Sequence, residues 1–302
     1  MDWGIHLPQL GKQVDREGLI RFAQRIDELG IHSGWVSDHV CWPAEFEPNY
    51  PYSVDGSFPA PNDMAWLDPI GTLFFVAAST ENLKLGTTVL ILPYRLPVVT
   101  AKQLATLDVL SNGRLILGVG VGWMKEEAEV LGMPFDHRGK RSNEQLEIFK
   151  SLFTESEPEF HGEYYQLPKV RFEPKPIQDP VPVWVGGNTS LAFQRVAKYG
   201  QGFQAAFQSF ERIKEEIKEI HQCCEAINRD PNELTFSARM YLDPKGMMEP
   251  EKSITGSHEQ MLATIDQFRS IGVSHILIDP VAPGGLDGRL DAVEQFMEFA
   301  ND

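Results

Sequence analysis

Apolar runs of strand length alternate with amphipathic helical patterns along nearly the whole chain. The first run, WGIHLP at 3–8, precedes a helical pattern over 15–29 that ends at Gly30. Near the middle, the pattern over 97–111 predicts a helix that stops at Asn112–Gly113. The alternation gives eight strand-plus-helix units, whose expected strands cover 3–8, 33–38, 83–92, 114–120, 180–186, 202–207, 234–242 and 274–279.

Eight such units in 302 residues predict a (β/α)₈ barrel that forms one domain over 1–302. An open, doubly wound α/β sheet is the alternative that the same pattern allows. In a barrel, active sites lie at the carboxyl ends of the strands, so we expect the catalytic and binding residues there.

Two long polar insertions, rich in proline and aromatic residues, interrupt the repeat. One runs from Cys41 to Trp66 after the second strand, and the other from Thr154 to Asp179 before the fifth. The first lies on the carboxyl face of a barrel, where it could wall a substrate pocket. The second begins on the opposite face and reaches the mouth only if it wraps around the barrel.

Composition and charge narrow the function classes. The chain is 42% hydrophobic and 23% charged, and it holds no apolar run of about 18 residues, so we expect no membrane span. Its start lacks the basic and apolar regions of a signal peptide. Three cysteines, with Cys223 and Cys224 adjacent, make neither a disulfide framework nor a zinc spacing, so we expect the reducing cytoplasm. A net charge of −16 disfavours nucleic acids and anionic membranes as partners.

Polar residues occur where the second and third strands end. Asp38 and His39 place a carboxylate beside an imidazole, which suits proton transfer or the holding of a polar ring. The alternative is that Asp38 caps a turn and His39 lies on the surface. Gly86 inside the third strand indicates a bulge, although a plain buried strand also fits.

Glycine-rich turns follow the fourth and fifth strands. Gly118, Gly120 and Gly122 precede a helical pattern, but their spacing fails the dinucleotide-binding fingerprint. The second turn, 186–190, reads Gly-Gly-Asn-Thr-Ser before another helix. Such turns free backbone N–H groups to approach an anion, and tight barrel packing is the alternative. Adjacent barrel strands would bring the two turns side by side.

A basic segment, DHRGKR at 136–141, contrasts with the acidic composition. Arg138, Lys140 and Arg141 could reach a phosphate held by the two turns, or they could pair with glutamates of their own helix, Glu144 or Glu147. The sequence has no zinc-protease, Walker A or nucleophile-elbow motif, and we expect no metal. These features predict a phosphorylated cofactor that carries the chemistry.

The chain resembles the luciferase-like monooxygenase superfamily, in its branch of F420-dependent oxidoreductases, over most of the first 200 residues. The matching segments are VSDH at 36–39, LGTTVLILPYRLPV at 85–98, AKQLATLDVLSNGRLILGVGVGW at 101–123, HRGKRSNEQLEIFKSLF at 137–153 and PVWVGGN at 182–188. The last hundred residues match mainly in architecture.

The resemblance implies a (β/α)₈ barrel and a set of site residues. His39 matches a catalytic histidine near the flavin or deazaflavin ring. Thr88–Val89 matches a non-prolyl cis peptide in a bulge that supports this ring. The implied cofactor-binding residues are Asp38, Thr88, Val89, Gly120, Val121, Gly122, Arg141, Gly186, Gly187 and Asn188. Trp42, Trp66 and Tyr94 are candidates for an apolar pocket over the ring.

The resemblance also implies hydride transfer between coenzyme F420 and a small organic substrate, with His39 handling the proton or orienting the substrate. The alternative is an FMN-dependent monooxygenase that takes reduced FMN from a partner flavin reductase, and a flavin-binding protein without turnover is a third possibility. Family members are usually homodimers. The sugar-phosphate dehydrogenases of the family carry a glutamate where this chain has Val121, so that activity is not assigned.

Overall fold

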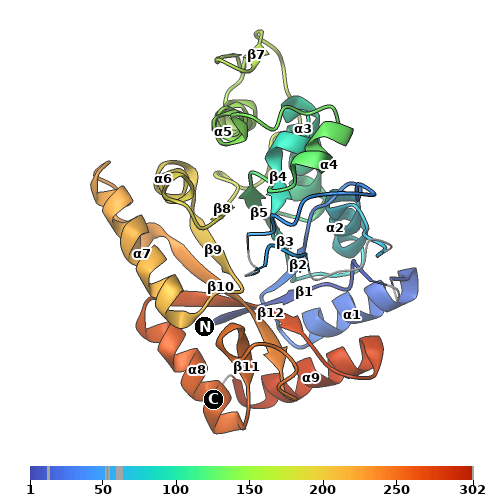
Figure 1. The fold of residues 1–302 in the computed structure, drawn as a ribbon. Coiled ribbons are helices and arrows are strands. Elements are labelled where there is room, and N and C mark those ends of the chain that lie inside the picture. Colours follow the sequence, from blue (N-terminus) through green and yellow to red (C-terminus); the bar gives the residue numbers. More distant parts are fainter. Residues whose placement is uncertain (12–13, 52, 54, 59–63, 301–302) are drawn as a thin grey trace.

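The computed structural model describes the chain except 12–13, 52, 54, 59–63 and 301–302, and some residues of the first predicted insertion fall among these. Eight parallel strands close into a barrel, because β9 pairs with β10 and β12 with β1 (Figure 1). The predicted barrel is therefore confirmed, and the open-sheet alternative is wrong. The barrel strands, in spatial order, are β1 (Asp2–His6), β2 (Ser33–Val36), β3 (Lys84–Thr87), β5 (Leu115–Gly120), β8 (Val183–Gly186), β9 (Gly202–Ala206), β10 (Thr235–Asp243) and β12 (Val273–Pro280).

Helices surround the barrel, as Figure 1 shows. In α1 the buried residues Leu19, Phe22, Ala23 and Ile26 recur at helical spacing, and the Asp15 carboxylate accepts the Gly18 N–H at the first turn. No helix in the described residues is long and apolar enough to cross a membrane. The helices are α1 (Arg16–Glu28), α2 (Pro69–Ala77), α3 (Pro97–Leu110), α4 (Lys125–Val130), α5 (Arg138–Thr154), α6 (Ser190–Tyr199), α7 (Phe210–Glu225), α8 (His258–Ser270) and α9 (Gly285–Ala300).

The lower interior of the barrel is filled by large side chains, and the ring of the buried His275 lies among them, 4.9 Å from that of Trp184. Trp35, Ile116, Trp184 and Leu277 form a buried cluster, and the Trp35 and Trp184 rings lie 5.1 Å apart. A Cβ on Gly86 would lie 2.2 Å from the Trp35 ring, so glycine is required there for close packing. Because this layer is filled, a ligand can enter only above it, at the carboxyl mouth.

The third strand departs from the predicted continuous run over 83–92. It breaks after β3 and resumes as β4 (Leu90–Ile91), which pairs with β5. The peptide between Thr88 and Val89 is cis, as the resemblance implied, and we call this two-residue break in the strand the bulge. A short strand not predicted from the sequence, β11 (Ser253–Thr255), adds to the far end of β10.

The second insertion does wrap back toward the mouth. It contains an antiparallel hairpin of β6 (Phe160–His161) and β7 (Gln166–Leu167), which lies beside α5 in Figure 1. The Glu144 carboxylate on α5 accepts the backbone N–H groups of 163–165, at 2.7–3.3 Å. This contact holds the hairpin against the early part of α5, close to the basic segment.

Arg114 ties the lower end of β5 to its neighbours, and we expect its replacement to destabilise the fold. Its buried guanidinium donates hydrogen bonds to four acceptors, among them the carbonyls of Ala77 and Leu83 at 2.8 and 2.9 Å. Arg114→Met should lower the free energy of unfolding in urea by about 2–4 kcal/mol, because the buried acceptors lose their donors. Lys125→Met, at an exposed ion pair, is the control, and equal losses in both variants would contradict this account.

Candidate active site

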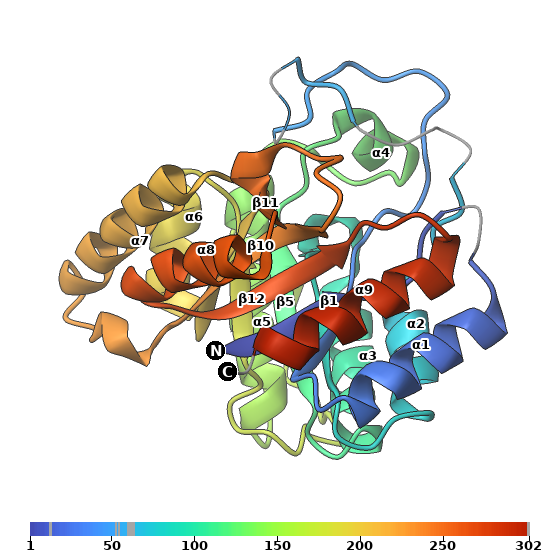
Figure 2. The same cartoon turned by 90° about the horizontal axis from the view of Figure 1, so that it is seen from below.

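The first insertion and α4 lie together at one end of the barrel, where the long blue loop of Figure 2 passes over α4. The strand-end residues Asp38 and His39 are buried beneath this cover. The backbone N–H of Glu47 donates to the Glu126 carboxylate at 3.1 Å and joins the loop to α4. The first insertion therefore covers the mouth.

His39 is held by a glutamate that sequence reasoning missed. Its Nδ1 lies 2.6 Å from Oε2 of Glu127, whose side chain is completely buried. The other carboxylate oxygen, Oε1, accepts the backbone N–H groups of Val40 and Cys41 at 2.7 and 3.2 Å. Glu127 thus fixes both the imidazole and the chain that follows β2.

Aromatic rings enclose the His39 imidazole. The Trp42 ring stacks on it at 4.6 Å between centroids, and the Trp66 ring meets it edge-on at 5.0 Å. Phe58 and Trp123 complete the enclosure, with their own rings stacked at 5.9 Å. Two of the three predicted pocket aromatics are therefore beside His39. The third, Tyr94, packs with Ile91 and Ala128 and donates to the Met124 carbonyl.

The Asp38 carboxylate forms an ion pair with Arg95. This carboxylate accepts hydrogen bonds from Nη2 and Nε of Arg95 at 2.7 and 3.1 Å, and from the Ile91 N–H at 2.9 Å. Burial raises the pKa of Asp38, and Arg95 and the Ile91 N–H oppose that shift. Arg95 also reaches Asp68 at the start of α2. In this arrangement Asp38 fixes the segment after the bulge.

The glycines of β5 and β8 make room for the bulge. A Cβ on Gly118 would lie 1.7 Å from the Thr87 carbonyl oxygen, so that oxygen occupies the space over Gly118. A Cβ on Gly120 or on Gly186 would lie 2.4 or 2.8 Å from methyl groups of Val89. The Val89 side chain therefore sits between the two glycine-containing strand ends, which the pairing of β5 with β8 brings side by side.

A polar layer lies across the barrel at the level of the bulge. Arg239 and Asp279 form a bidentate salt bridge, in which Nε and Nη2 of Arg239 donate to the two carboxylate oxygens at 2.7 and 2.8 Å. Nη1 of Arg239 donates to the Thr88 carbonyl at 3.2 Å. Burial alone would raise the pKa of Asp279, but the guanidinium holds it below its usual value. His6 bonds Ser37 at 2.8 Å, and burial lowers the pKa of His6 to about 4, so it is neutral near pH 7.

The two glycine turns lie near cationic side chains. Gly122 and Gly187 have φ of 77° and 127°, left-handed values that favour glycine. Nε of Arg138 donates to the Gly122 carbonyl at 3.1 Å. Nη2 of Arg212, on the first turn of α7, donates to the Asn188 carbonyl at 3.3 Å. Each turn thus has a guanidinium hydrogen-bonded to one of its backbone carbonyls.

Arg141 has an unsatisfied donor. Its guanidinium lies 4.5 Å over the Tyr164 ring of the inserted hairpin, and its buried Nε has no hydrogen-bond partner in the described part of the chain. The alternative of pairing within α5 is wrong: Glu144 accepts hairpin N–H groups, and Glu147 bonds Lys198 and Tyr199 of α6. A buried guanidinium N–H without a protein acceptor can take one from water or from a bound anion.

These features match a sequence family. The sequence model of the luciferase-like monooxygenase family matches residues 4–242, most of the chain. The chain belongs to the luciferase-like monooxygenase family. The resemblance to this family that was inferred from the motifs is thereby confirmed.

Curated relatives of this luciferase-like protein differ in cofactor. It is 36% identical over 179 residues to an uncharacterized protein of Mycobacterium tuberculosis, covering 59% of this chain and 62% of that one. It is 33% identical over 196 residues to an F420-dependent glucose-6-phosphate dehydrogenase of Amycolatopsis mediterranei, covering 64% and 54%. It is also 33% identical over 147 residues to an FMNH(2)-dependent dimethylsulfone monooxygenase of Pseudomonas putida, covering 47% and 40%. The matches thus span less than two thirds of these relatives.

Among solved structures, an F420-dependent secondary alcohol dehydrogenase in complex with an F420-acetone adduct superposes on the luciferase-like chain with a TM-score of 0.81. That match covers 100% of this chain and 99% of the other at 17% identity, so it shows the shared fold.

The luciferase-like site fits a flat ring with a phosphate tail. Because residues 118, 120 and 186 are glycines, Val89 is the side chain between the strand ends. A Cβ at any of the three would collide with the Thr87 carbonyl or with Val89. The Arg141 Nε lacks an acceptor that a phosphate would supply. Residues that sequence reasoning missed are Glu127, Arg95, Arg239 and Asp279.

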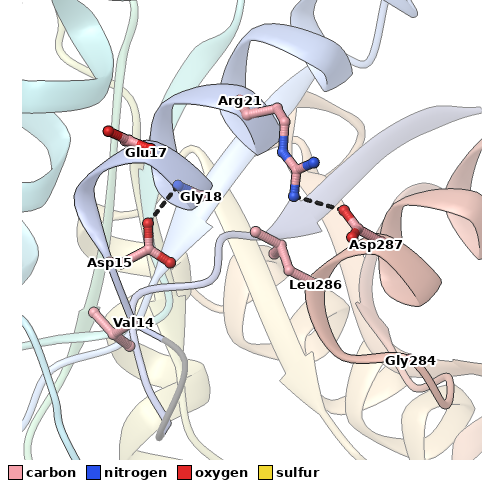
Figure 3. Close-up of a pocket in the computed structure, with 8 residues that line it drawn as sticks. All are labelled: Val14, Asp15, Glu17, Gly18, Arg21, Gly284, Leu286 and Asp287. Carbon is pink, nitrogen blue, oxygen red and sulfur yellow. Dashed lines mark hydrogen bonds and ion pairs between the residues drawn. The ribbon is translucent and has the colours of Figure 1, made fainter.

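A separate groove lies away from the residues at the barrel mouth. It has a volume of about 730 Å³ and runs between the starts of α1 and α9. Figure 3 shows Arg21 and Asp287 facing each other across it, at 2.6 Å, and Asp15 turned to the Gly18 N–H. None of the predicted site residues lines the groove, so the luciferase-like chemistry is not placed there.

Gly118→Ala should disturb the bulge, because the new Cβ would meet a backbone oxygen that cannot rotate away. We expect the free energy of unfolding to fall by about 1–3 kcal/mol or more. Gly71→Ala in α2 is the matched control: its new Cβ would lie 3.5 Å from the Asp68 carboxylate, an ordinary contact, so the change should be neutral or stabilising. Urea unfolding of both variants measures this, and wild-type stability of Gly118→Ala would refute the packing argument.

Glu216, a buried carboxyl on α7 that pairs with Arg212 at 3.1 Å, should make stability depend on pH. Burial raises its pKa to about 7 from a usual value of 4.5. The folded state therefore retains a proton that the unfolded state loses, and the free energy of unfolding falls as pH rises from about 4.5 to 7. The loss amounts to at most about 3 kcal/mol.

Glu216→Gln should remove that fall, whereas Glu215→Gln, at an exposed partner of the same arginine, should keep it. Urea unfolding at pH 5, 6, 7 and 8 makes the comparison. Parallel pH profiles for Glu216→Gln and the wild type would show that another group is responsible.

Proposed function

We propose that this chain is an oxidoreductase that transfers a hydride between coenzyme F420 and a small organic substrate. The observation that carries the proposal is His39: a buried imidazole, bonded to Glu127 and enclosed by tryptophans, at a barrel mouth beside the bulge. When bound, the deazaflavin supplies the carbon that accepts or gives up the hydride.

The residues of the chain have separate roles in this proposal. The Thr88–Val89 bulge and Gly120 support the ring, and Gly122, Gly187 and Asn188 offer turns for the phosphate. Arg141 and Arg212 supply the positive charge that an anionic tail needs in a chain of net charge −16.

His39 handles the proton. As an alcohol substrate loses its hydride, its hydroxyl proton passes to Nε2 of His39, and the reverse reaction returns it to the carbonyl oxygen. Trp42 and Trp66 keep water from the reacting atoms and give the substrate an apolar wall. An alcohol, ketone or aldehyde with a small apolar body fits this surrounding.

FMN-dependent monooxygenation is the second candidate, and the 33% identity to the FMNH(2)-dependent relative favours it. The match to the F420-dependent relative covers more of the chain, 64% against 47%, which supports F420 as the cofactor. We do not propose that relative's sugar phosphate as a substrate of this chain, because Val121 stands where the family's sugar-phosphate dehydrogenases carry a glutamate. A cytoplasmic location, a homodimer and a reductase partner for the FMN alternative stay predictions from the sequence.

Equilibrium titration tests the choice of cofactor. The purified chain should bind F420 at least about tenfold more tightly than oxidised or reduced FMN, a difference of about 1.4 kcal/mol, when followed by fluorescence. Bound F420 should then be reduced on addition of a secondary alcohol, seen as loss of its absorbance. Tighter binding of reduced FMN, with oxygen uptake on addition of substrate, would contradict the proposal and support the monooxygenase.

A further inference from the structure

We infer that Glu127 sets the tautomer of His39, so that Nδ1 carries the ring proton and Nε2 is left free to accept one. This assigns to Glu127 the part of a positioning residue for the imidazole. The inference deepens the proposed function and rests on it for the use of the free nitrogen. The tautomer itself is a property of the chain without any cofactor.

The carboxylate of Glu127 is acceptor-only, and each of its oxygens has a defined donor. Oε1 accepts the N–H groups of Val40 and Cys41, and Oε2 faces Nδ1 of His39 at 2.6 Å. Because a carboxylate offers no proton, Nδ1 must be the donor in this contact. In a neutral imidazole the other nitrogen then carries none.

The surroundings prevent the ring from exchanging its nitrogens. Stacking on Trp42 at 26° between planes and the edge contact with Trp66 fix the ring plane. A ring flipped by 180° would set a carbon against Oε2 and lose the hydrogen bond to a fully buried carboxylate. In the described part of the chain, Nε2 has no hydrogen-bond partner within the protein.

Tyr94 is a buried phenol close to Glu127. Burial raises the pKa of Tyr94, and the negative charge of Glu127 raises it further. Its hydroxyl donates to the Met124 carbonyl at 2.9 Å, one turn before Glu127. The phenol therefore brings no second negative charge next to Glu127.

Glu127→Gln makes a sharp test because it keeps the shape and changes the hydrogen-bond pattern. The amide oxygen must take the place of Oε1, where the N–H groups of Val40 and Cys41 need an acceptor. The amide NH₂ then faces Nδ1 of His39 and donates to it. The imidazole must respond by moving its proton to Nε2, so the substitution should reverse the tautomer.

Nitrogen NMR of protein labelled with ¹⁵N-histidine measures this directly, without cofactor, at a pH where the ring is neutral. The His39 signals are assigned by their loss in His39→Gln. In the wild type we expect the ¹⁵N chemical shift of Nδ1 to lie in the range of a protonated ring nitrogen and that of Nε2 in the range of an unprotonated one. In Glu127→Gln we expect the two to exchange, while Glu129→Gln, an exposed neighbour on α4, keeps the wild-type pattern.

Two results would overturn the inference. The first is an Nε2-protonated His39 in the wild type, which decides the question even if Glu127→Gln fails to fold. The second is a folded Glu127→Gln protein with the wild-type tautomer, which would leave Glu127 a purely structural role. Neither result depends on F420, so a failure of the proposed function is seen separately, in the cofactor titration.

A turnover measurement adds the functional consequence. If Nε2 takes the substrate proton, Glu127→Gln should lower kcat by about 10²–10⁴-fold, the usual contribution of general acid–base catalysis, with a smaller change in KM. Unchanged kcat in a variant whose tautomer has reversed would show that Nε2 does not take the proton.

Discussion

The break in the third barrel strand after Thr87 is the constraint on which the site depends. There the Thr87 carbonyl turns over Gly118, and Val89 enters between Gly120 and Gly186. A barrel strand of regular register would instead pair along its whole length with β5. Because the Thr87 carbonyl and the Val89 side chain occupy that space, side chains are excluded at three positions of β5 and β8. The floor of the mouth therefore combines Val89 with the polar layer around Arg239 and Asp279.

Ion pairs hold the elements around this floor. Asp38 and Arg95 fix the segment that follows the bulge, and Asp279 and Arg239 connect two strands to the Thr88 carbonyl. Such buried pairs contribute little net stability relative to apolar packing, but losing one partner leaves an expensive unpaired charge. We therefore interpret these pairs as devices that fix geometry at the mouth, in a chain whose net charge is −16.

The sequence predicted the barrel and most of its elements, because each strand and each amphipathic helix has a local hydrophobic period. The glycine turns and the Asp38–His39 pair were found because their residue types are unusual at strand ends. Glu127 could not be found this way: it stands in the run KEEAEV, where nothing local distinguishes it from Glu126 or Glu129. Its role comes from tertiary contact with residues nearly ninety positions earlier.

The place of the inserted hairpin also could not be predicted from local sequence. Its contact with Glu144 and Arg141 depends on backbone N–H groups and on a ring face, neither of which leaves a periodic pattern. Similarly, Asp38 was expected to lie against the cofactor, whereas its carboxylate is engaged by Arg95 and the Ile91 N–H. A motif located the residue, but only the fold gave the direction of its side chain.

A crystal structure of the chain with bound F420 tests the central claim most directly. The account predicts the deazaflavin ring against Val89, the phosphate beside Gly187 and Arg141, and the reacting carbon facing the pocket side on which His39 lies. A substrate atom would then fit within ~3–3.5 Å of both that carbon and Nε2 of His39. A ring bound elsewhere, for example in the groove between α1 and α9, would contradict the account.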